Sequence, residues 1–422
     1  MALVRSVVGQ VLERGAPRSP ARRALRRCAR SLEGGTEAVR EACVQVLRHS
    51  EAACLVYPYE HVPASLRAER ADALFLACAF ALAHDPASRP ASFWLKCVHD
   101  LDRVLIVAPP DGARVALAHA LIAAVQAHCD ACDASDQRAP RKRLRHAIEA
   151  PRRSLPTASA PVHEYAEPPD LGTFQRHCVS NVCAYGRPFV ARQFAQSWPA
   201  LERWQDPAYL LHRAGPGRHV PVESGRTYTD PQWGQGLWPW AAFLAHIQWG
   251  RASAPRAPTL YLAQHTLLTQ FPWLADDFTT PAYAVHGTKS PAAHGRAAPV
   301  VQVWMGPAAT TSPAHTDPYY NCYVQVVGHK LVWLAPPPSD STGGLCVHGG
   351  PEDEDVYTRW MSNTSRVDVF GPLDAAPAAF QAQVAPCAEW VYLHPGDLLF
   401  VPPGWWHAMQ STTQSLSVSF WF

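Results

Sequence analysis

The spacing of apolar residues changes along the chain from a helical period to a strand-like one. In residues 1–134 Ala, Leu and Arg dominate, and apolar positions recur every three or four residues, as on a helix with one buried face. Helices are predicted at about 65–84 and about 112–128, the second burying one face that carries Leu117, Leu121 and Val125. The pattern therefore predicts an α-helical N-terminal domain.

Beyond residue 170, short β-branched and aromatic runs alternate with Pro/Gly turns. Strands are predicted at 300–304, 323–327, 330–334, 391–393, 398–401 and 415–421. Gly328-His329 suits a two-residue hairpin turn between two of these strands, and residues 395–397 suit another tight turn. Many short strands joined in this way predict a double-sheet barrel, so the chain as a whole is α+β.

Between these two regions the composition shifts to Arg, Pro, Ser and Ala. Residues 135–169 are accordingly predicted to link the helical domain at 1–134 to a β-rich domain at 170–422. A basic run at 138–145 fits either a nuclear-import signal or a solvated linker. We therefore expect the protein in the nucleus, the cytoplasm or both.

The overall composition is that of a soluble globular protein with a sizeable core. Of the 422 residues, 48% are hydrophobic and 17% charged, and 40 prolines with 24 glycines indicate many turns. The apolar segment 71–83 is too short to span a bilayer. The net charge is +2, and the excess of Arg in residues 1–50 is interpreted as a solvated face. We expect neither membrane insertion nor direct nucleic-acid binding.

The twelve cysteines form no dense framework, and residues 1–15 lack an apolar stretch of the kind found in signal peptides. These features predict free thiols in a reducing compartment. Cys129 and Cys132 form a CxxC pair, but no second pair follows at zinc-site spacing. We therefore interpret them as helix thiols rather than metal ligands.

A His-x-Asp pair, His315 and Asp317, lies in the β-rich region, and His407 follows Asp317 by 90 residues. In a strand, residues i and i+2 point to the same side, so the pair can bind one metal while His407 comes from another strand. Two histidines and one carboxylate on one face of Fe(II) leave the opposite face open for substrate and dioxygen. Although one His-x-Asp pair alone is a weak signal, the set predicts a non-haem iron oxygenase.

Lys330 is one of only four lysines among 37 basic residues, and it begins a predicted core strand. If the Gly328 turn pairs this strand with the preceding one, the ammonium projects into the barrel near the metal. A buried ammonium needs an anionic partner, and the distal carboxylate of 2-oxoglutarate would provide one. The alternative is an exposed lysine on a hairpin.

Three segments that contain these residues resemble a JmjC domain: 312–318 (SPAHTDP), 321–330 and 395–407 (PGDLLFVPPGWWH). Shorter segments narrow the resemblance to the lysine demethylase 8 subfamily, namely 220–233, 261–265, 304–307, 363–369 and 417–421. The resemblance covers about residues 165–422, and a helical N-terminal domain also fits it. It implies a C-terminal double-stranded β-helix of the jelly-roll or cupin kind.

The resemblance also implies a cofactor set. The two histidines and Asp317 would bind Fe(II), and Lys330 would bind the distal carboxylate of 2-oxoglutarate, the cosubstrate that reacts with O2. Tyr261, Ser312 and Asn321 would be polar neighbours of that cosubstrate. Each of the three has a structural alternative: a core aromatic, a turn residue before a proline and a loop hydrogen-bonder, respectively.

The substrate implied by the resemblance is a protein or peptide, such as a histone or another arginine-containing protein. Glu223 is predicted to lie in the substrate pocket, where its carboxylate would pair bidentately with a guanidinium. The rest of the pocket would come from Trp233, Gln264 and Trp304. A solvent-facing Glu223 and an aromatic cage for methyl-lysine are the alternatives.

These features lead us to predict arginyl hydroxylation. Histone methyl-lysine demethylation and a catalytically silent scaffold are the alternative functions. Residues 286–299 and 339–359 are predicted to be expanded loops that could shape the substrate entrance. The acidic run 352–355 within the second loop either attracts a basic substrate tail or is simply solvated.

Overall fold

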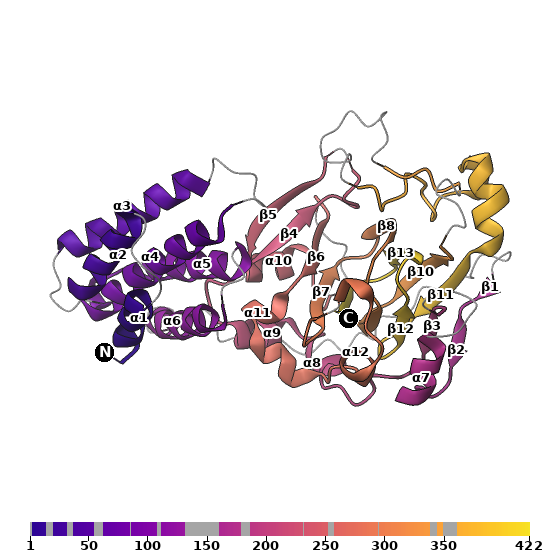
Figure 1. Cartoon of the computed structure of the whole chain (residues 1–422), viewed down its shortest axis with the longest axis horizontal. Coiled ribbons are helices and arrows are strands. Elements are labelled where there is room, and N and C mark those ends of the chain that lie inside the picture. The colour runs from indigo at the N-terminus through magenta and orange to yellow at the C-terminus, as the bar shows by residue number, and fades with distance from the viewer. Residues whose placement is uncertain are drawn as a thin grey trace. The chain divides into compact units, whose positions relative to one another are not determined.

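The computed structural model divides the chain into two compact units (Figure 1). It describes residues 2–13, 20–31, 37–54, 62–84, 86–107, 111–130, 160–178, 186–230, 232–251, 257–293, 295–337, 344–348 and 361–422. The first unit is Met1–Lys142 with Leu211–Val220 and Pro239–Ala241, and the remainder forms the second. The predicted linker at 135–169, its basic run and Cys132 lie largely or wholly outside the described residues, so the predicted domain boundaries stay predictions.

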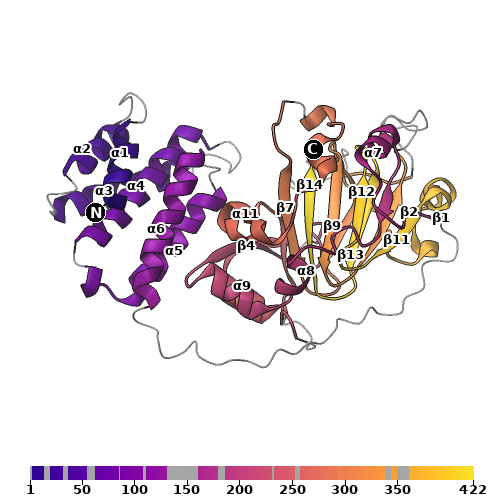
Figure 2. The same ribbon diagram turned by 90° about the horizontal axis from the view of Figure 1, so that it is seen from below.

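Helices α1 to α6 make up most of the first unit, shown in indigo and purple in Figures 1 and 2. They are α1 (Ala2–Glu13), α2 (Pro20–Ser31), α3 (Glu37–Cys54), α4 (Ala64–Ala83), α5 (Ala91–Val107) and α6 (Gly112–Asp130). The helices predicted at 65–84 and 112–128 are confirmed as α4 and α6. Leu117, Leu121 and Val125 are buried as predicted, because the α6 face that they share packs into the helical core. No described helix combines the length and the hydropathy that crossing a bilayer requires.

Two buried aspartates fix the packing within this unit. Arg114 at the start of α6 donates to both carboxylate oxygens of Asp72 in α4, at 3.0 Å each. Arg218, in the stretch 211–220 that belongs to this unit, pairs in the same bidentate way with Asp102 of α5, at 2.8 and 3.0 Å. Since a buried charge that loses its partner is strongly destabilising, each pair favours one arrangement of its elements.

Fourteen strands are assigned in the described residues after the first helices. They are β1 (Ala160–Pro161), β2 (His163–Tyr165), β3 (Phe189–Ala191), β4 (His219–Ser224), β5 (Gly234–Pro239), β6 (Leu260–His265), β7 (Val300–Gly306), β8 (Thr311–Thr316), β9 (Asn321–Val327), β10 (Lys330–Ala335), β11 (Glu389–Leu393), β12 (Leu398–Val401), β13 (Trp406–Ser411) and β14 (Ser415–Trp421). The helices of this region are α7 (Leu171–Cys178), α8 (Ala200–Arg203), α9 (Pro207–Ala214), α10 (Trp240–His246), α11 (Leu267–Gln270) and α12 (Ala282–His286). All six strands predicted from the sequence are present.

The strands form two sheets that face each other. One has five strands in the order β1-β11-β10-β13-β8, and the other has nine in the order β2-β3-β12-β9-β14-β7-β6-β4-β5; Figure 2 shows β7, β14, β9 and β12 side by side. From β7 to β10 and from β11 to β14, consecutive strands alternate between the sheets, which is the topology of a double-stranded β-helix. The predicted α+β class with a C-terminal cupin-like barrel is confirmed.

The barrel interior is lined partly by apolar and partly by polar side chains. Val332, Leu334 and Val391 belong to its apolar cluster. The serines of β14 also face inward, where Ser417 pairs with the Tyr323 hydroxyl and Ser419 accepts from the Trp304 indole N–H at 2.7 Å. A hydrogen-bond partner offsets the cost of burying each of these two hydroxyls.

The predicted hairpin at Gly328-His329 is wrong. The turn does connect β9 to β10, but β9 belongs to the nine-stranded sheet and β10 to the five-stranded one, where Lys330 lies opposite Leu393 and Ser411. The turn therefore carries the chain across the barrel. Gly328 is required there, because its φ is +71° and an added Cβ would lie 1.7 Å from the Gln414 carbonyl oxygen.

The insertion between β10 and β11 covers the outer face of the five-stranded sheet. Trp333 and Trp406 point outward from that sheet and pack against Leu345, Val367 and Phe380 of the insertion, whose last helical turns appear in gold in Figure 1. Most of the loop predicted at 339–359, including the acidic run, lies outside the described residues. The loop predicted at 286–299 carries one short 3₁₀ turn, Pro291–Ala293.

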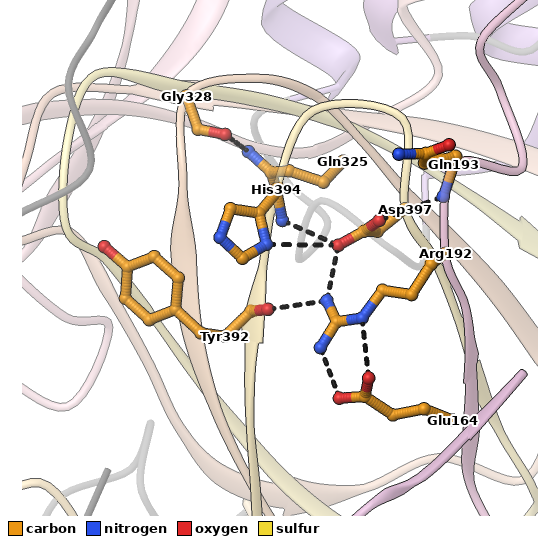
Figure 3. Close-up of polar contacts among 8 residues, drawn as sticks. All are labelled: Glu164, Arg192, Gln193, Gln325, Gly328, Tyr392, His394 and Asp397. Carbon is orange, nitrogen blue, oxygen red and sulfur yellow. Dashed lines mark hydrogen bonds and ion pairs between the residues drawn. The ribbon is translucent and has the colours of Figure 1, made fainter. Parts of the chain in front are cut away.

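A buried carboxylate closes the end of the barrel at the predicted turn 395–397 (Figure 3). Asp397 accepts hydrogen bonds from Arg192 at 2.6 Å, from the Gln193 amide at 3.1 Å and from the His394 amide at 2.9 Å. Arg192 also pairs with Glu164 and donates to the Tyr392 carbonyl. One arginine thus joins β2, the segment after β3, and the β11–β12 turn.

Candidate active site

The fold brings His315, Asp317 and His407 together at one end of the barrel. His315 of β8 lies directly opposite His407 of β13, with ring centroids 4.3 Å apart, and Asp317 follows the end of β8. His407 Nε2 and an Asp317 carboxylate oxygen are 3.6 Å apart. One ligand atom from each of the three residues lies within 4.8 Å of the others, which is the separation expected around a shared metal ion.

Hydrogen bonds orient both histidines toward that shared point. Nδ1 of His315 lies 2.7 Å from the Pro313 carbonyl oxygen, and Nδ1 of His407 lies 3.1 Å from the Trp405 carbonyl oxygen. Since a carbonyl can only accept, each Nδ1 carries the proton and each Nε2 keeps its lone pair for a metal. Burial, and then the neighbouring His315, lower the pKa of His407 to about 4, so its imidazole stays neutral.

A β-bulge allows Ser312 to share the site with His315. His407 pairs with His315, but Met409, two residues later on β13, pairs with Ser312, three residues earlier on β8. The additional residue in β8 reverses the alternation of its side chains, as bulges do next to many active sites. Ser312 and His315 consequently both line one cavity with His407 and Lys330.

Lys330 lies in the same cavity, and its side chain is buried inside the barrel rather than exposed on a hairpin. Its Nζ donates to the Tyr261 hydroxyl at 3.2 Å and lies 5.4 Å from the centre of the Tyr323 ring. Burial lowers the pKa of Lys330 to about 7, from an ordinary value of 10.5. An anion bound beside it would restore the charged form, so this geometry fits a carboxylate ligand.

Polar groups without partners also point to a ligand in this cavity. Its lining includes Asn321 and Trp421, and both the Asn321 side-chain oxygen and the Trp421 indole N–H are buried without a hydrogen-bond partner. Buried polar atoms normally have partners, so a bound molecule is the natural explanation for unpaired ones. A small acid with several oxygens would satisfy the Trp421 donor together with the Lys330 ammonium.

Glu223 lies in β4 opposite Tyr261 of β6, the residue whose hydroxyl accepts from Lys330. Its carboxyl is half-buried, and burial raises its pKa against the opposing effect of the Trp233 and Gln235 side chains. Glu223 forms no ion pair within the part of the chain that the structure describes. A partly desolvated carboxylate without a cation is suited to bind one.

Trp304 and Gln264 were both predicted for the substrate pocket, but only one of them lies in the cavity of the metal cluster. Trp304 lines the cavity of the metal cluster, with its indole held by Ser419. Gln264 is exposed at a register shift in β6, with φ +47°, and does not line that cavity. The structure therefore brings Trp304 to the site but not Gln264.

Sequence reasoning missed Tyr228 and Thr364. The Tyr228 hydroxyl lies 3.4 Å from the Thr364 side-chain oxygen, and the charges of Asp317 and Glu223 both act on it. Thr364 lies opposite His315 in an isolated β-bridge. Each residue occurs in a segment that resembles the JmjC domain, but they are 136 positions apart, so only the fold could join them.

A double-stranded β-helix that holds two histidines and one carboxylate around a single point belongs to the cupin class, and its donor set suits Fe(II). Residues 175–422 match the family model described as the Cupin-like domain, so the chain belongs to this family. Among its relatives are JmjC-domain proteins, which confirms the JmjC resemblance seen in the sequence.

Three relatives illustrate the similarity. Jumonji C domain-containing protein 5 of Drosophila melanogaster is 36% identical over 256 residues, which is 60% of this chain and 58% of that protein. Lysine-specific demethylase 8 of Xenopus tropicalis is 33% identical over 240 residues, 56% of this chain and 48% of that protein. The human bifunctional peptidase and (3S)-lysyl hydroxylase JMJD7 is 27% identical over 258 residues, 56% of this chain and 77% of that protein. The chain thus spans about half the length of the first two relatives.

Proposed function

We propose that this protein is an Fe(II)- and 2-oxoglutarate-dependent oxygenase that hydroxylates an arginyl residue in a protein substrate. The observation that carries the proposal is the half-buried Glu223 carboxylate, which has no ion pair among the described residues and lies opposite Tyr261, the hydrogen-bond partner of Lys330. Tyr228 relates the two sites, because burial and then the charges of both Asp317 and Glu223 raise the pKa of its hydroxyl. A substrate cation bound at Glu223 would therefore place its side chain beside the metal.

The proposed cofactors are supported by the residues that would hold them. His315, Asp317 and His407 offer two nitrogen ligands and one oxygen ligand, the set used by Fe(II) oxygenases. Lys330 would hold the distal carboxylate of 2-oxoglutarate, with Tyr261 as its hydrogen-bonded neighbour. When bound, Fe(II) would supply the oxidising chemistry; the chain itself binds the two substrates, orients them and excludes water.

An arginine fits the Glu223 site better than a methylated lysine does. A guanidinium is permanently charged and presents paired N–H donors that match a carboxylate. A methyl-lysine is recognised instead by several aromatic faces around the cation. Modification of a lysine is the competing function, because relatives are named as a lysine demethylase and a lysyl hydroxylase. A catalytically silent scaffold is disfavoured, because the chain has both the metal cluster and Lys330.

Mass spectrometry of two peptides decides between these functions. An arginine-containing peptide and a methyl-lysine histone peptide are incubated with the protein, Fe(II), ascorbate and 2-oxoglutarate, with the His315→Ala variant as control. We expect one oxygen atom to be added at arginine and succinate to form in step. Loss of a methyl group from lysine would establish the demethylase instead, and no oxidation with no succinate above the control would establish the scaffold.

The role of Glu223 is tested with an isosteric variant. Glu223→Gln removes the charge and keeps the shape, so we expect the KM for the arginyl peptide to rise at least tenfold, as for loss of a charge-assisted hydrogen-bond pair of about 1.5–3 kcal/mol. The matched control is Glu202→Gln, an exposed carboxylate in α8. An unchanged KM in Glu223→Gln would refute the pocket assignment and leave the metal site untouched.

A further inference from the structure

The insertion between β10 and β11 adds a strand-like segment to the edge of β8, the strand that carries His315. The Thr316 amide donates to the Asn363 carbonyl at 3.0 Å, and the Ser365 amide donates to the Ala314 carbonyl at 2.7 Å. These two bonds place Thr364 opposite His315. Thr364 itself is 2% exposed. The insertion is therefore anchored to the metal-bearing strand by its own backbone.

Three side chains of this region form a chain of hydrogen bonds whose direction is fixed at one end. The Asn363 side-chain amide donates to the Thr316 carbonyl at 2.9 Å, so the Asn363 oxygen is the acceptor on its other side. Thr364 Oγ1 donates to that oxygen at 3.4 Å. Since a hydroxyl has one hydrogen, Thr364 can then only accept from the Tyr228 hydroxyl, 3.4 Å away.

This direction determines what Tyr228 can offer a substrate. Its hydrogen points to Thr364, so its oxygen lone pairs face away from Thr364 and are available as acceptors. Burial, together with the charges of Asp317 and Glu223, raises the pKa of Tyr228 to about 12, although Thr364 opposes the shift. The hydroxyl thus stays protonated at neutral pH. A neutral acceptor near two carboxylates favours a cationic donor.

We propose that Asn363 and Thr364 orient the Tyr228 hydroxyl so that its oxygen accepts a hydrogen bond from the guanidinium of an arginyl substrate bound at Glu223. The inference rests on the proposed function and adds a specificity determinant to it. A guanidinium has five N–H donors and no acceptor, so it can serve Glu223 and Tyr228 together. A trimethylated lysine has no N–H to give, so the same oxygen would gain nothing from it.

The two 3.4 Å distances are long for hydrogen bonds between oxygens. Hydrogen bonds of active sites are often long before the substrate binds and tighten afterwards. A cationic donor on the Tyr228 oxygen would polarise its O–H and strengthen the bond to Thr364. The chain of hydrogen bonds from Asn363 through Thr364 to Tyr228, here called the relay, therefore couples substrate binding to the edge of the metal-bearing strand. Tyr228 is the substrate-binding group, and Thr364 and Asn363 are positioning residues.

The test compares two substitutions at Thr364, one that removes only the hydroxyl group and one that removes only the methyl group. Thr364→Val keeps the shape and removes the hydroxyl, whereas Thr364→Ser keeps the hydroxyl. We expect the KM for the arginyl peptide to rise about three- to tenfold in Thr364→Val and in Tyr228→Phe, the effect of one hydrogen bond. Thr364→Ser should restore the KM to within about twofold of the wild type. Succinate formed per hydroxylated arginine should also rise in both impaired variants, because the substrate is held less firmly over the metal.

The chain offers a matched control for the loss of a tyrosine hydroxyl. Tyr392 and Thr412 form a hydroxyl pair, 2.6 Å apart, that does not line the cavity of the metal cluster. Tyr392→Phe should leave the KM for the arginyl peptide within about twofold of the wild type. A rise equal to that of Tyr228→Phe would show a general loss of packing and overturn the proposed relay.

The outcomes separate this inference from the function on which it rests. Wild-type protein that oxidises no arginyl peptide overturns both. Wild-type oxidation of arginine with an unchanged KM and an unchanged succinate ratio in Thr364→Val overturns the relay alone. A raised KM in Thr364→Ser equal to that in Thr364→Val would also overturn it, because the hydroxyl would then not be the group that matters.

Discussion

Lys330 should make the affinity for 2-oxoglutarate depend on pH in a defined direction. Burial lowers its pKa to about 7 in the ligand-free protein, whereas an ordinary lysine has a pKa of 10.5. A carboxylate bound beside the ammonium favours the charged form and raises the pKa again. Binding above pH 7 must therefore take up a proton, and the affinity must fall as the pH rises.

The expected magnitude follows from the lowered pKa. With a free-state pKa of about 7 and a bound-state pKa restored to about 10.5, the Kd should rise about fivefold from pH 7 to pH 8 and about fiftyfold from pH 7 to pH 9. Proton uptake should be about 0.9 per 2-oxoglutarate at pH 8 and about 0.1 at pH 6. His407, whose pKa lies near 4, does not titrate in this range.

Isothermal titration calorimetry measures both quantities. The protein is loaded with Ni(II), which does not turn over, and 2-oxoglutarate is titrated at each pH in two buffers of different ionisation enthalpy. Two variants serve as controls. Lys330→Arg keeps a charge that does not titrate here, and Lys330→Met removes it, so neither should take up a proton.

Wild-type affinity that stays constant between pH 7 and pH 9 would refute this reasoning. The same slope in Lys330→Arg as in the wild type would do so too, because the proton would then belong to another group. For Lys330→Met we expect a weak affinity for 2-oxoglutarate that does not change with pH. Together the wild type and the two variants distinguish the charge of the side chain from its titration.

Two further predictions concern the metal cluster and the barrel. Asp317→Ala should abolish Co(II) binding measured by visible absorption, since it removes the only carboxylate of the cluster. The control Asp374→Ala, at an exposed residue, should bind Co(II) as the wild type does. Tight Co(II) binding by Asp317→Ala would contradict the ligand assignment. Asp397→Asn should lower the free energy of unfolding of the barrel by about 2–4 kcal/mol in calorimetric melts, because the buried partner of Arg192 loses its charge. Glu164→Gln, at the exposed end of the same network, should cost less than about 1 kcal/mol, and equal losses would argue against a buried ion pair at Asp397.

Much of the barrel was predictable because it depends on local patterns. Six of its strands were predicted from β-branched runs, and the helices α4 and α6 from the helical spacing of their apolar residues. The metal cluster was predictable for a similar reason: His315 and Asp317 are two residues apart in the sequence, and the strand period places them on one side. His407 could be added from the motif around it.

The wrong hairpin prediction shows that local patterns do not predict which sheet a strand joins. Gly328-His329 has the sequence of a tight turn, and it is one, but nothing in the turn itself states which sheet the next strand joins. Only the folded chain shows that choice: Lys330 lies opposite Leu393 of β11 and Ser411 of β13. The prediction that Lys330 points into the barrel nevertheless agrees with the structure, because its burial depends on the strand period rather than on the partner.

By itself, the sequence determined six strands, the helices α4 and α6 and the identity of the candidate metal residues, since these follow from periodicity and from motifs only a few residues long. The cupin-like fold was implied by the resemblance of those motifs to a JmjC domain. The tertiary structure decided which distant residues share a surface. It placed Thr364 of an insertion against Tyr228 and His315, and it moved Gln264 away from the cavity at a register shift in β6. These contacts join positions far apart in the sequence, 136 residues for Tyr228 and Thr364, and they form only after the chain has folded.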